Sequence, residues 1–241
     1  MYAQFLQEYA MAARKNSLAG SDVEYRLATP EDFEDVLEFT KTHFFQEEPV
    51  CRNLVDSAQG LVVFLGGTLK RALESNLSAL AIEQATGELV GYRMTTTAER
   101  TENTENFEVE SEITFGLLKP ELAAFLEALE ELKNHMWDYV PEGVNKIVRR
   151  ELACVRKDHQ RKGIGKKLGT VFLENSELKN EGYEGILGET ASLVDQKMLA
   201  KEGFTPLKEV LFADFKAKDG SKLPPTFDDG TTKLVLNFKR L

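Results

Sequence analysis

The chain has 241 residues, of which 42% are hydrophobic, enough to bury a sizeable core. Its 40 acidic residues outnumber its 30 basic ones, and the net charge of −10 disfavours nucleic acid and anionic membranes as partners. No apolar run approaches the roughly 20 residues of a membrane helix, and the first 20 residues lack a secretory pattern. We therefore expect a cytoplasmic protein, and the acidic balance mildly favours a cationic small substrate.

The cysteines and histidines do not suggest a metal site. Cys51 and Cys154 lie far apart, and free thiols are the default in a chain without a secretory signal. Cys154 stands in an apolar run and is expected to be a small buried hydrophobe. The three histidines are scattered, so no group has metal-ligand spacing and no metal is expected.

The elements expected at the start of the chain mix strands and helices. Residues 1–21 are interpreted as an arm or short helix, and residues 22–241 as a single domain. A strand at 23–27 precedes a helix that has Thr29 as N-cap and Pro30 at its first position. Further predictions for this half are an irregular loop at 46–60, a short helix at 66–76, and a hairpin at 77–100 that turns at Thr86 and Gly87.

The second half continues the alternation. A polar, acidic stretch at 100–112 is expected to be a mobile loop. After it the pattern predicts, in order, a long amphipathic helix at 119–140, a strand at 146–155, a helix ending at Gly182, a strand at 185–191, a helix at 192–204, and strands at 208–215 and 231–241. These signals indicate one α/β domain with a mixed sheet and at least one strand–helix–strand crossover.

A basic, glycine-bearing turn separates the strand at 146–155 from the helix that follows. It gathers Arg156, Lys157, His159, Arg161, Lys162, Gly163, Gly165, Lys166 and Lys167. A helix N-terminus presents unpaired N–H groups and a positive dipole end, and glycine lets a diphosphate approach the backbone. The spacing is neither that of a P-loop nor that of a dinucleotide fingerprint. A diphosphate cradle is one interpretation, and a basic helix start with glycines for tight packing is the other.

The six residues Gln160-Arg161-Lys162-Gly163-Ile164-Gly165 resemble the Q/R-x-x-G-x-G/A motif of the GNAT superfamily of acetyl-CoA-dependent N-acetyltransferases. The resemblance covers roughly residues 22–241. It implies a mostly antiparallel, mixed central sheet with splayed strands, flanked by helices. It also implies that the loop from Gln160 to Lys166 holds the diphosphate of acetyl-CoA, and that the backbone of Cys154 and Val155 pairs with the pantetheine arm like an added strand.

A second likeness concerns the segment after the first helix. "FFQEEPV" and the later "FADFK" are similar to segments of the insect-type arylalkylamine N-acetyltransferases. The resemblance implies that Glu48 is the general base, although Glu47 could be the carboxylate that faces inward. The aromatic residues Phe44 and Phe45 could line a pocket for an aryl group, and Glu47 could contact the substrate.

The sequence departs from the family where the thiolate leaving group is protonated. Many GNAT enzymes carry a tyrosine four residues before the glycine that ends the last helix, and here that residue is Leu199. The insect-type group carries serines near the start of this helix. Here Ser192 survives at or next to one of them and Asp195 occupies the place of the second. The donor could therefore be Ser192, Thr190 or water, and Ser192 could equally be only a helix N-cap.

The expected function is acetyl transfer from acetyl-CoA to the primary amine of a small, arylalkyl amine, by direct attack in a ternary complex. Neither cysteine resembles a nucleophile of this family. A monomer without nucleic-acid or membrane partners is expected. One alternative is an acetyltransferase for a polyamine or a peptide lysine. Another is a non-catalytic acyl-CoA-binding module, which the missing tyrosine suggests.

Overall fold

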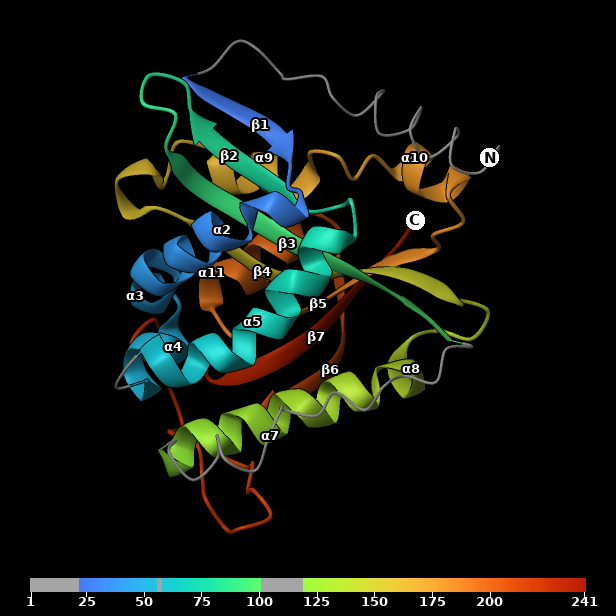
Figure 1. Cartoon of the computed structure of the whole chain (residues 1–241). Helices are drawn as coiled ribbons and strands as arrows, with labels where there is room; N and C mark the ends of the chain where they lie inside the picture. Colours follow the sequence, from blue (N-terminus) through green and yellow to red (C-terminus); the bar gives the residue numbers. More distant parts are fainter. Residues whose placement is uncertain (1–21, 56–57, 101–118) are drawn as a thin grey trace.

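The computed structural model describes residues 22–55, 58–100 and 119–241, without the side chains of residues 58–64. Within these residues, seven strands form one sheet in the order β1-β2-β3-β4-β5-β7-β6 (Figure 1). The strands are β1 (Val23–Leu27), β2 (Ala79–Glu83), β3 (Leu89–Glu99), β4 (Lys146–Val155), β5 (Gly185–Thr190), β6 (Thr205–Leu211) and β7 (Lys233–Arg240). The expected arm at 1–21 and nearly all of the acidic loop at 100–112 lie outside the described residues.

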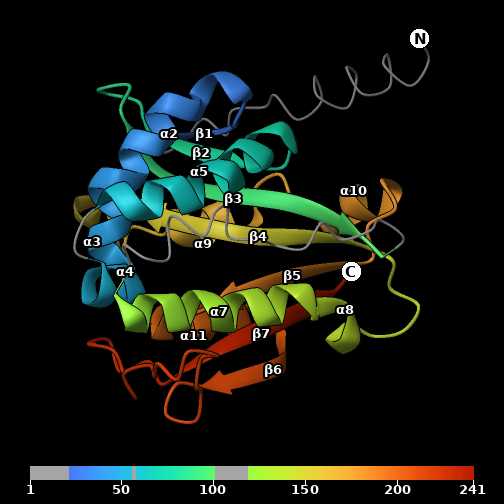
Figure 2. The same ribbon diagram turned by 60° about the horizontal axis from the view of Figure 1, so that its bottom comes forward.

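The sheet is mostly antiparallel, as predicted. Every neighbouring pair of strands is antiparallel except β4 and β5, which run parallel. The parallel pairing extends only from Ile147, opposite Gly185, to Arg150, opposite Gly188. Beyond that point β4 continues beside β3 alone, and β4 and β5 diverge (Figure 2). The last residues of β4 therefore have one edge without a strand partner among the described residues, which is the splay that the resemblance implied.

A β-bulge interrupts the pairing of β3 with β4 at the point where β4 and β5 diverge. Met94 of β3 faces Leu152 and Thr95 faces Arg150, so Glu151 has no residue opposite it. Its carboxylate accepts from the Lys133 ammonium at 2.6 Å and from the Thr96 hydroxyl at 2.6 Å. Burial opposes the charge of this carboxylate, but the cations Arg149 and Lys133 hold its pKa below the usual range. The residue at the bulge is thus a buried carboxylate held by a hydroxyl and by cations from α7 and β4.

Helices cover both faces of the sheet (Figures 1 and 2). The segments on one face are η1 (Pro30–Asp32), α2 (Phe33–Phe39), the π-helical η2 (Thr40–Phe44), α3 (Phe45–Glu47), α4 (Pro49–Leu54), α5 (Ala58–Glu74), α7 (Pro120–Asn134) and α8 (Met136–Tyr139). The other face carries α9 (Ile164–Thr170), α10 (Asn175–Asn180) and α11 (Leu193–Lys201), and η3 (Lys157–His159) follows β4. Apolar side chains fill both interfaces, as in other layered α/β units.

The prediction of an irregular loop at 46–60 is wrong. Glu48 accepts from the amide of Cys51 and Pro49 takes the first helical position, so α4 begins here. The helix α5 starts at Ala58 rather than at residue 66. The pair Gly66 and Gly67, which the sequence pattern placed at a helix start, lies inside α5, where packing against the sheet outweighs their weak propensity.

The helix predicted to run to Gly182 is also interrupted. It ends at Thr170, Phe172 takes a left-handed backbone with φ of 59°, and α10 begins only at Asn175. Phe172 is buried against β1 and β2 together with Ile164 and Leu168. Burial of this ring rather than helical propensity decides the break. The long helix predicted at 119–140 likewise divides at His135, and β6 starts at Thr205, three residues earlier than expected.

Candidate active site

The glycine-bearing turn has the shape expected of an anion-binding loop. Gly163 is the N-cap of α9 with φ of +85°, and Arg161 also has a left-handed backbone with φ of 60°. A Cβ at Gly163 would meet no atom within 4 Å, so the glycine serves the backbone angle rather than close packing. The side chains of Arg161, Lys162 and Lys166 are exposed around the start of α9.

The base of this loop is fastened to the sheet. His159 is buried, and its ring contacts Asp158 at 2.9 Å and Glu83 of β2 at 3.0 Å. Arg156 is held by Glu88 at 2.7 Å and by Asp158 at 2.9 Å. This buried side chain therefore anchors the loop to β2.

The far end of α9 is fastened by the buried Arg93 of β3. Its guanidinium donates to the carbonyls of Leu168 and Val171 at the end of that helix. Together with the His159 contacts, this fixes α9 at both ends relative to the sheet. A loop that is held in place from both sides can present its amides to a ligand without first becoming ordered.

The two cysteines come together near the end of β4, Cys154 from this strand and Cys51 from α4. Cys154 is buried and packs in the same apolar cluster as Tyr92 and Cys51. Burial raises the pKa of the Cys154 thiol to about 12 and that of Cys51 well above its usual range. Both thiols are neutral at physiological pH, so neither suits covalent catalysis. Val155 packs on the other face, beside Ile164 of α9.

Glu48 stands at the junction of α3 and α4, with an extended backbone at φ of −81° and ψ of 122°. Pro49 accounts for these angles, because a proline disfavours helical angles at the residue before it. One carboxylate oxygen accepts from the Cys51 amide at 2.9 Å. Burial raises the pKa of Glu48 to about 7, and the negative charge of Asp195 acts in the same direction. At neutral pH this carboxyl group is therefore balanced between its two protonation states.

Glu47 points to a different partner. It belongs to the single turn of α3, not to an extended segment, and its carboxylate accepts from the Gln160 amide group at 2.8 Å. Gln160 also donates to the Val155 carbonyl at 3.0 Å. Two residues that the sequence assigned separately, to the substrate and to the cofactor, thus join the segment before Glu48 to the loop before α9.

The aromatic pair before this segment divides between the core and the surface. Phe44 is buried in the cluster that includes Tyr92 and Cys51, so its ring is packed by protein rather than open to a ligand. Phe45 packs partly against the same cluster and keeps an exposed portion. Of the two, Phe45 has surface to offer to an aryl group.

Ser192 is the N-cap of α11, which is one of the two roles that the sequence left open for it. Its hydroxyl oxygen is the N-cap of α11, accepting from the Asp195 amide at 3.1 Å, and its hydroxyl donates to the Asp195 carboxylate at 2.8 Å. The Thr190 hydroxyl is buried on the side of β7 and accepts from Asn237 at 2.9 Å. Both hydroxyls are thus already engaged within the protein.

Asp195 is a site residue to which the sequence pattern assigned no role. Burial raises its pKa, and its negative charge in turn raises those of Glu48 and Cys154. A side chain of α11 therefore acts electrostatically on groups of both α4 and the end of β4. A serine three residues before an aspartate is an ordinary capping pattern, so the sequence carried no signal beyond a helix start.

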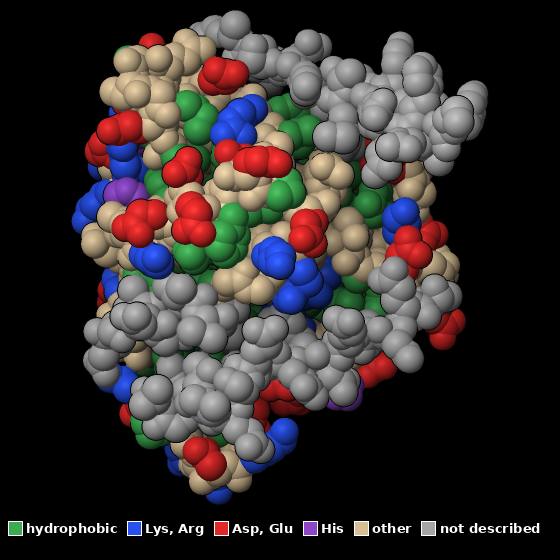
Figure 3. Space-filling model, viewed as in Figure 1, with side chains coloured by type: hydrophobic (Ala, Val, Ile, Leu, Met, Phe, Trp, Pro, Cys, Tyr) green, Lys and Arg blue, Asp and Glu red, His purple; other side chains and the backbone are tan. Residues whose placement is uncertain are grey.

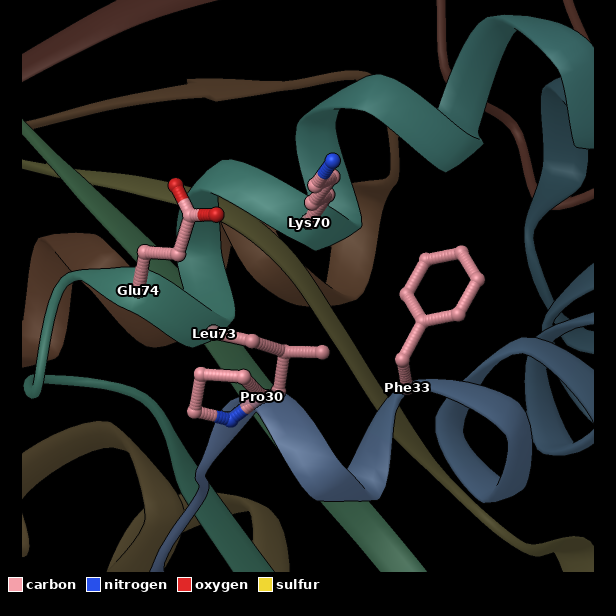
Figure 4. Close-up of a pocket in the computed structure, with 5 residues that line it drawn as sticks. All are labelled: Pro30, Phe33, Lys70, Leu73 and Glu74. Atoms are coloured by element: carbon pink, nitrogen blue, oxygen red, sulfur yellow. The ribbon is translucent and has the colours of Figure 1, made fainter.

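The remaining surface features do not add to this site. A groove of about 250 Å³ lies between α5 and the segment formed by η1 and the start of α2. It is lined by Pro30, Phe33, Lys70, Leu73 and Glu74, none of which was predicted to be functional (Figure 4). On the face seen in Figure 1, acidic and basic side chains are interspersed (Figure 3). Within the described ranges, no group of three or more His, Cys, Asp or Glu residues could hold a metal, and no helix is long and apolar enough to cross a membrane.

Comparison with known proteins gives the fold a context. No family model and no curated protein matches the sequence. Among solved structures, arylalkylamine N-acetyltransferase 2 from Aedes aegypti is 20% identical with a TM-score of 0.72, over 91% of this chain and 99% of that one. The mosquito arylalkylamine N-acetyltransferase like 5b is 18% identical with a TM-score of 0.67, over 91% of this chain and 100% of that one.

A third similar structure is the Drosophila melanogaster polyamine N-acetyltransferase, described as forming N-acetylagmatine. It is 12% identical with a TM-score of 0.63, over 91% of this chain and 100% of that one. At these identities the likeness is one of fold. It confirms the fold class expected from the resemblance, a GNAT-like α/β domain similar to those of the insect enzymes.

Proposed function

We propose that this protein transfers an acetyl group from acetyl-CoA to the primary amine of a small amine, an arylalkylamine in the first instance. The observation that carries the proposal is Glu48, a carboxyl group whose pKa burial raises to about 7 near the end of β4, where this strand pairs with β3 alone among the described strands. A general base works best when its pKa lies near the operating pH. The fold of the similar N-acetyltransferases supports the reaction class.

The residues of the loop suit acetyl-CoA. The left-handed Gly163 and the exposed Arg161, Lys162 and Lys166 would receive the diphosphate, and the open edge at Cys154 and Val155 would pair with an extended pantetheine arm. Once bound there, acetyl-CoA would supply the activated acyl group.

The protein's part in the reaction is the movement of protons. An alkylammonium has a pKa near 10, so removing its proton at pH 7 costs roughly 4 kcal/mol. Glu48 would accept this proton, and the neutral nitrogen would attack the thioester carbon. As the C–N bond forms and the C–S bond breaks, the nitrogen gives up a second proton. One of the two protons ends on sulfur and the other goes to solvent, and no covalent enzyme intermediate is needed.

The two candidate substrates are an arylalkylamine and a polyamine. A polyamine is the alternative that an observation favours: Glu47, Glu48 and Asp195 bring three carboxyl groups to the region, and one structure of similar fold is a polyamine N-acetyltransferase. Phe45 favours an arylalkylamine instead. We also expect, as the sequence suggested, that the protein is cytoplasmic and acts as a monomer, and size-exclusion chromatography tests the latter.

The test is thiol release from acetyl-CoA with a panel of amines. We expect arylalkylamines to give a higher kcat/KM than spermidine, and a tenfold preference for spermidine over every arylalkylamine would reject the aryl assignment. No thiol release with any amine would favour an acyl-CoA-binding module.

Glu48→Gln should lower kcat by about 10²–10⁴ near neutral pH and leave CoA binding unchanged, because glutamine cannot accept the proton. The defect should shrink as the pH rises toward the amine pKa. Glu47→Gln is the matched control, since it removes a neighbouring carboxylate that binds Gln160. Loss of activity in this control alone would move the base by one residue.

A further inference from the structure

Two consecutive aspartates between β6 and β7 contact two different helices of the site. The Asp228 carboxylate accepts two hydrogen bonds from the guanidinium of Arg52 in α4, at 2.6 and 2.7 Å. The neighbouring Asp229 accepts from the amide of Leu193, the first residue of α11, at 2.8 Å. The segment from β6 to β7 thus reaches both α4 and α11 (Figure 1).

These two helices carry the groups assigned to the reaction. Glu48 is the N-cap of α4, and the Arg52 amide donates to the Glu48 carbonyl at 3.1 Å. The Arg52 guanidinium also donates to the carbonyl of Glu47. On the other side, the N-cap Ser192 of α11 binds the Asp195 carboxylate. One pair of adjacent residues therefore connects the segment that carries Glu48 to the segment that carries Asp195.

The turn that carries the two aspartates is anchored in the core through Asp229 and Phe227. Asp229 accepts from the amide of the buried Thr231 at 2.9 Å and from its hydroxyl at 2.7 Å. The Phe227 amide donates to the Thr231 carbonyl at 2.9 Å, which closes the turn. The Phe227 ring packs edge-on against Phe212, with ring centroids 5.0 Å apart. A turn held in this way keeps Asp228 and Asp229 in fixed positions, and so constrains the helices that they contact.

We propose that Asp228 and Asp229 are positioning residues, a two-point clamp that sets the distance between Glu48 on α4 and Asp195 on α11 across the acceptor site. This inference rests on the proposed function, because it assigns the clamp to the site of amine deprotonation. A two-pronged Arg–carboxylate contact fixes orientation as well as distance. Displacement of a reacting group by about 1 Å can cost 10²-fold in rate.

Stability alone does not account for the contact between Arg52 and Asp228. The two side chains are 31% and 48% exposed. Ion pairs this open to water contribute little to the free energy of unfolding. Loss of the pair should therefore appear in turnover much more than in stability.

The pKa of Glu48 responds to the distance between the carboxyl groups of Glu48 and Asp195. Glu48 faces the negative charge of Asp195 from α11, and on its own helix it faces the positive charge of Arg52 and the neutral thiol of Cys51. Asp195 in turn faces Ser192, Arg150 of β4, Asp229 and Glu202. Because a nearby negative charge opposes ionisation of a carboxyl group, moving Asp195 away lowers the pKa of Glu48.

The experiment compares Asp228→Asn, Arg52→Gln and the double variant with wild type, and Asp214→Asn is the control because Asp214 is exposed on the same segment. Asp228→Asn should lower kcat about 10- to 100-fold, and KM for acetyl-CoA should stay within about twofold of wild type. The low-pH limb of kcat should move to lower pH. The double variant should lose no more than Arg52→Gln alone, since Arg52→Gln already removes the contact with Asp228 as well as that with the Glu47 carbonyl.

Two outcomes would overturn the clamp. One is a wild-type kcat and pH profile in Asp228→Asn. The other is full additivity of the two single losses. If the wild-type protein acetylates no amine, the proposed function fails, and the clamp is then judged without turnover. Carboxyl ¹³C NMR titration should show a lower pKa of Glu48 in Asp228→Asn than in wild type, and equal values would overturn the inference.

Discussion

Replacing Glu48 with glutamine should stabilise the folded protein at high pH while it removes activity, because the burial that makes this carboxyl group a base also opposes its ionisation. The pKa of Glu48 is about 7 in the folded protein against 4.5 for an unperturbed glutamate. The folded state therefore binds the proton more tightly than the unfolded chain does. This contribution is fully present below about pH 4.5 and is lost as the pH rises through about 7.

The magnitude follows from these two values. Between about pH 5 and pH 8 the wild-type protein should lose about 2.5 kcal/mol of unfolding free energy from this group alone. Glu48 keeps some contact with solvent, so about 1–2.5 kcal/mol is the expected range. Glu48→Gln has no such proton to lose, and glutamine can still accept from the Cys51 amide. Its stability relative to wild type should rise by that amount between the two pH values.

The assay is urea unfolding of both proteins near pH 5 and near pH 8, followed by the fluorescence of the single tryptophan, Trp137. Glu34→Gln is the matched control, because Glu34 is exposed on α2 and its substitution should change stability little at either pH. If Glu48→Gln tracks wild type at both pH values, the carboxyl group does not have a raised pKa. Glu48 would then lack the pKa near 7 that suits a general base at neutral pH.

Two further variants test the loop and the cap. Gly163→Val should abolish binding of CoA in isothermal titration calorimetry with the fold retained, because valine disfavours the φ of +85°. The control Gly165→Ala should still bind CoA, since its Cβ would lie 3.8 Å from Val155. Equal CoA affinities of the two variants would contradict the loop assignment. Ser192→Ala should lower the free energy of unfolding by about 1 kcal/mol through loss of the N-cap, and an unchanged urea midpoint would show that Asp195 or another group replaces the cap.

Local patterns in the amino-acid sequence determined several elements of the fold and the position of the glycine-bearing loop. Alternating apolar residues and a Thr86-Gly87 turn indicated the hairpin that became β2 and β3. The run of glycines and basic residues after β4 placed the loop at the start of α9, and Pro49 fixed the backbone of Glu48. Each of these features depends on residues close together in the chain, so the sequence alone can express it.

Tertiary structure decided the features that depend on distant residues. The helix after the loop stops because Phe172 is buried against β1 and β2, and Phe44 is a core residue because the sheet lies over it. The raised pKa of Glu48 arises from burial and from Asp195, and Arg52 meets Asp228 across 176 positions of sequence. Burial and long-range charge exist only once the chain is folded, so no local pattern could have predicted these contacts.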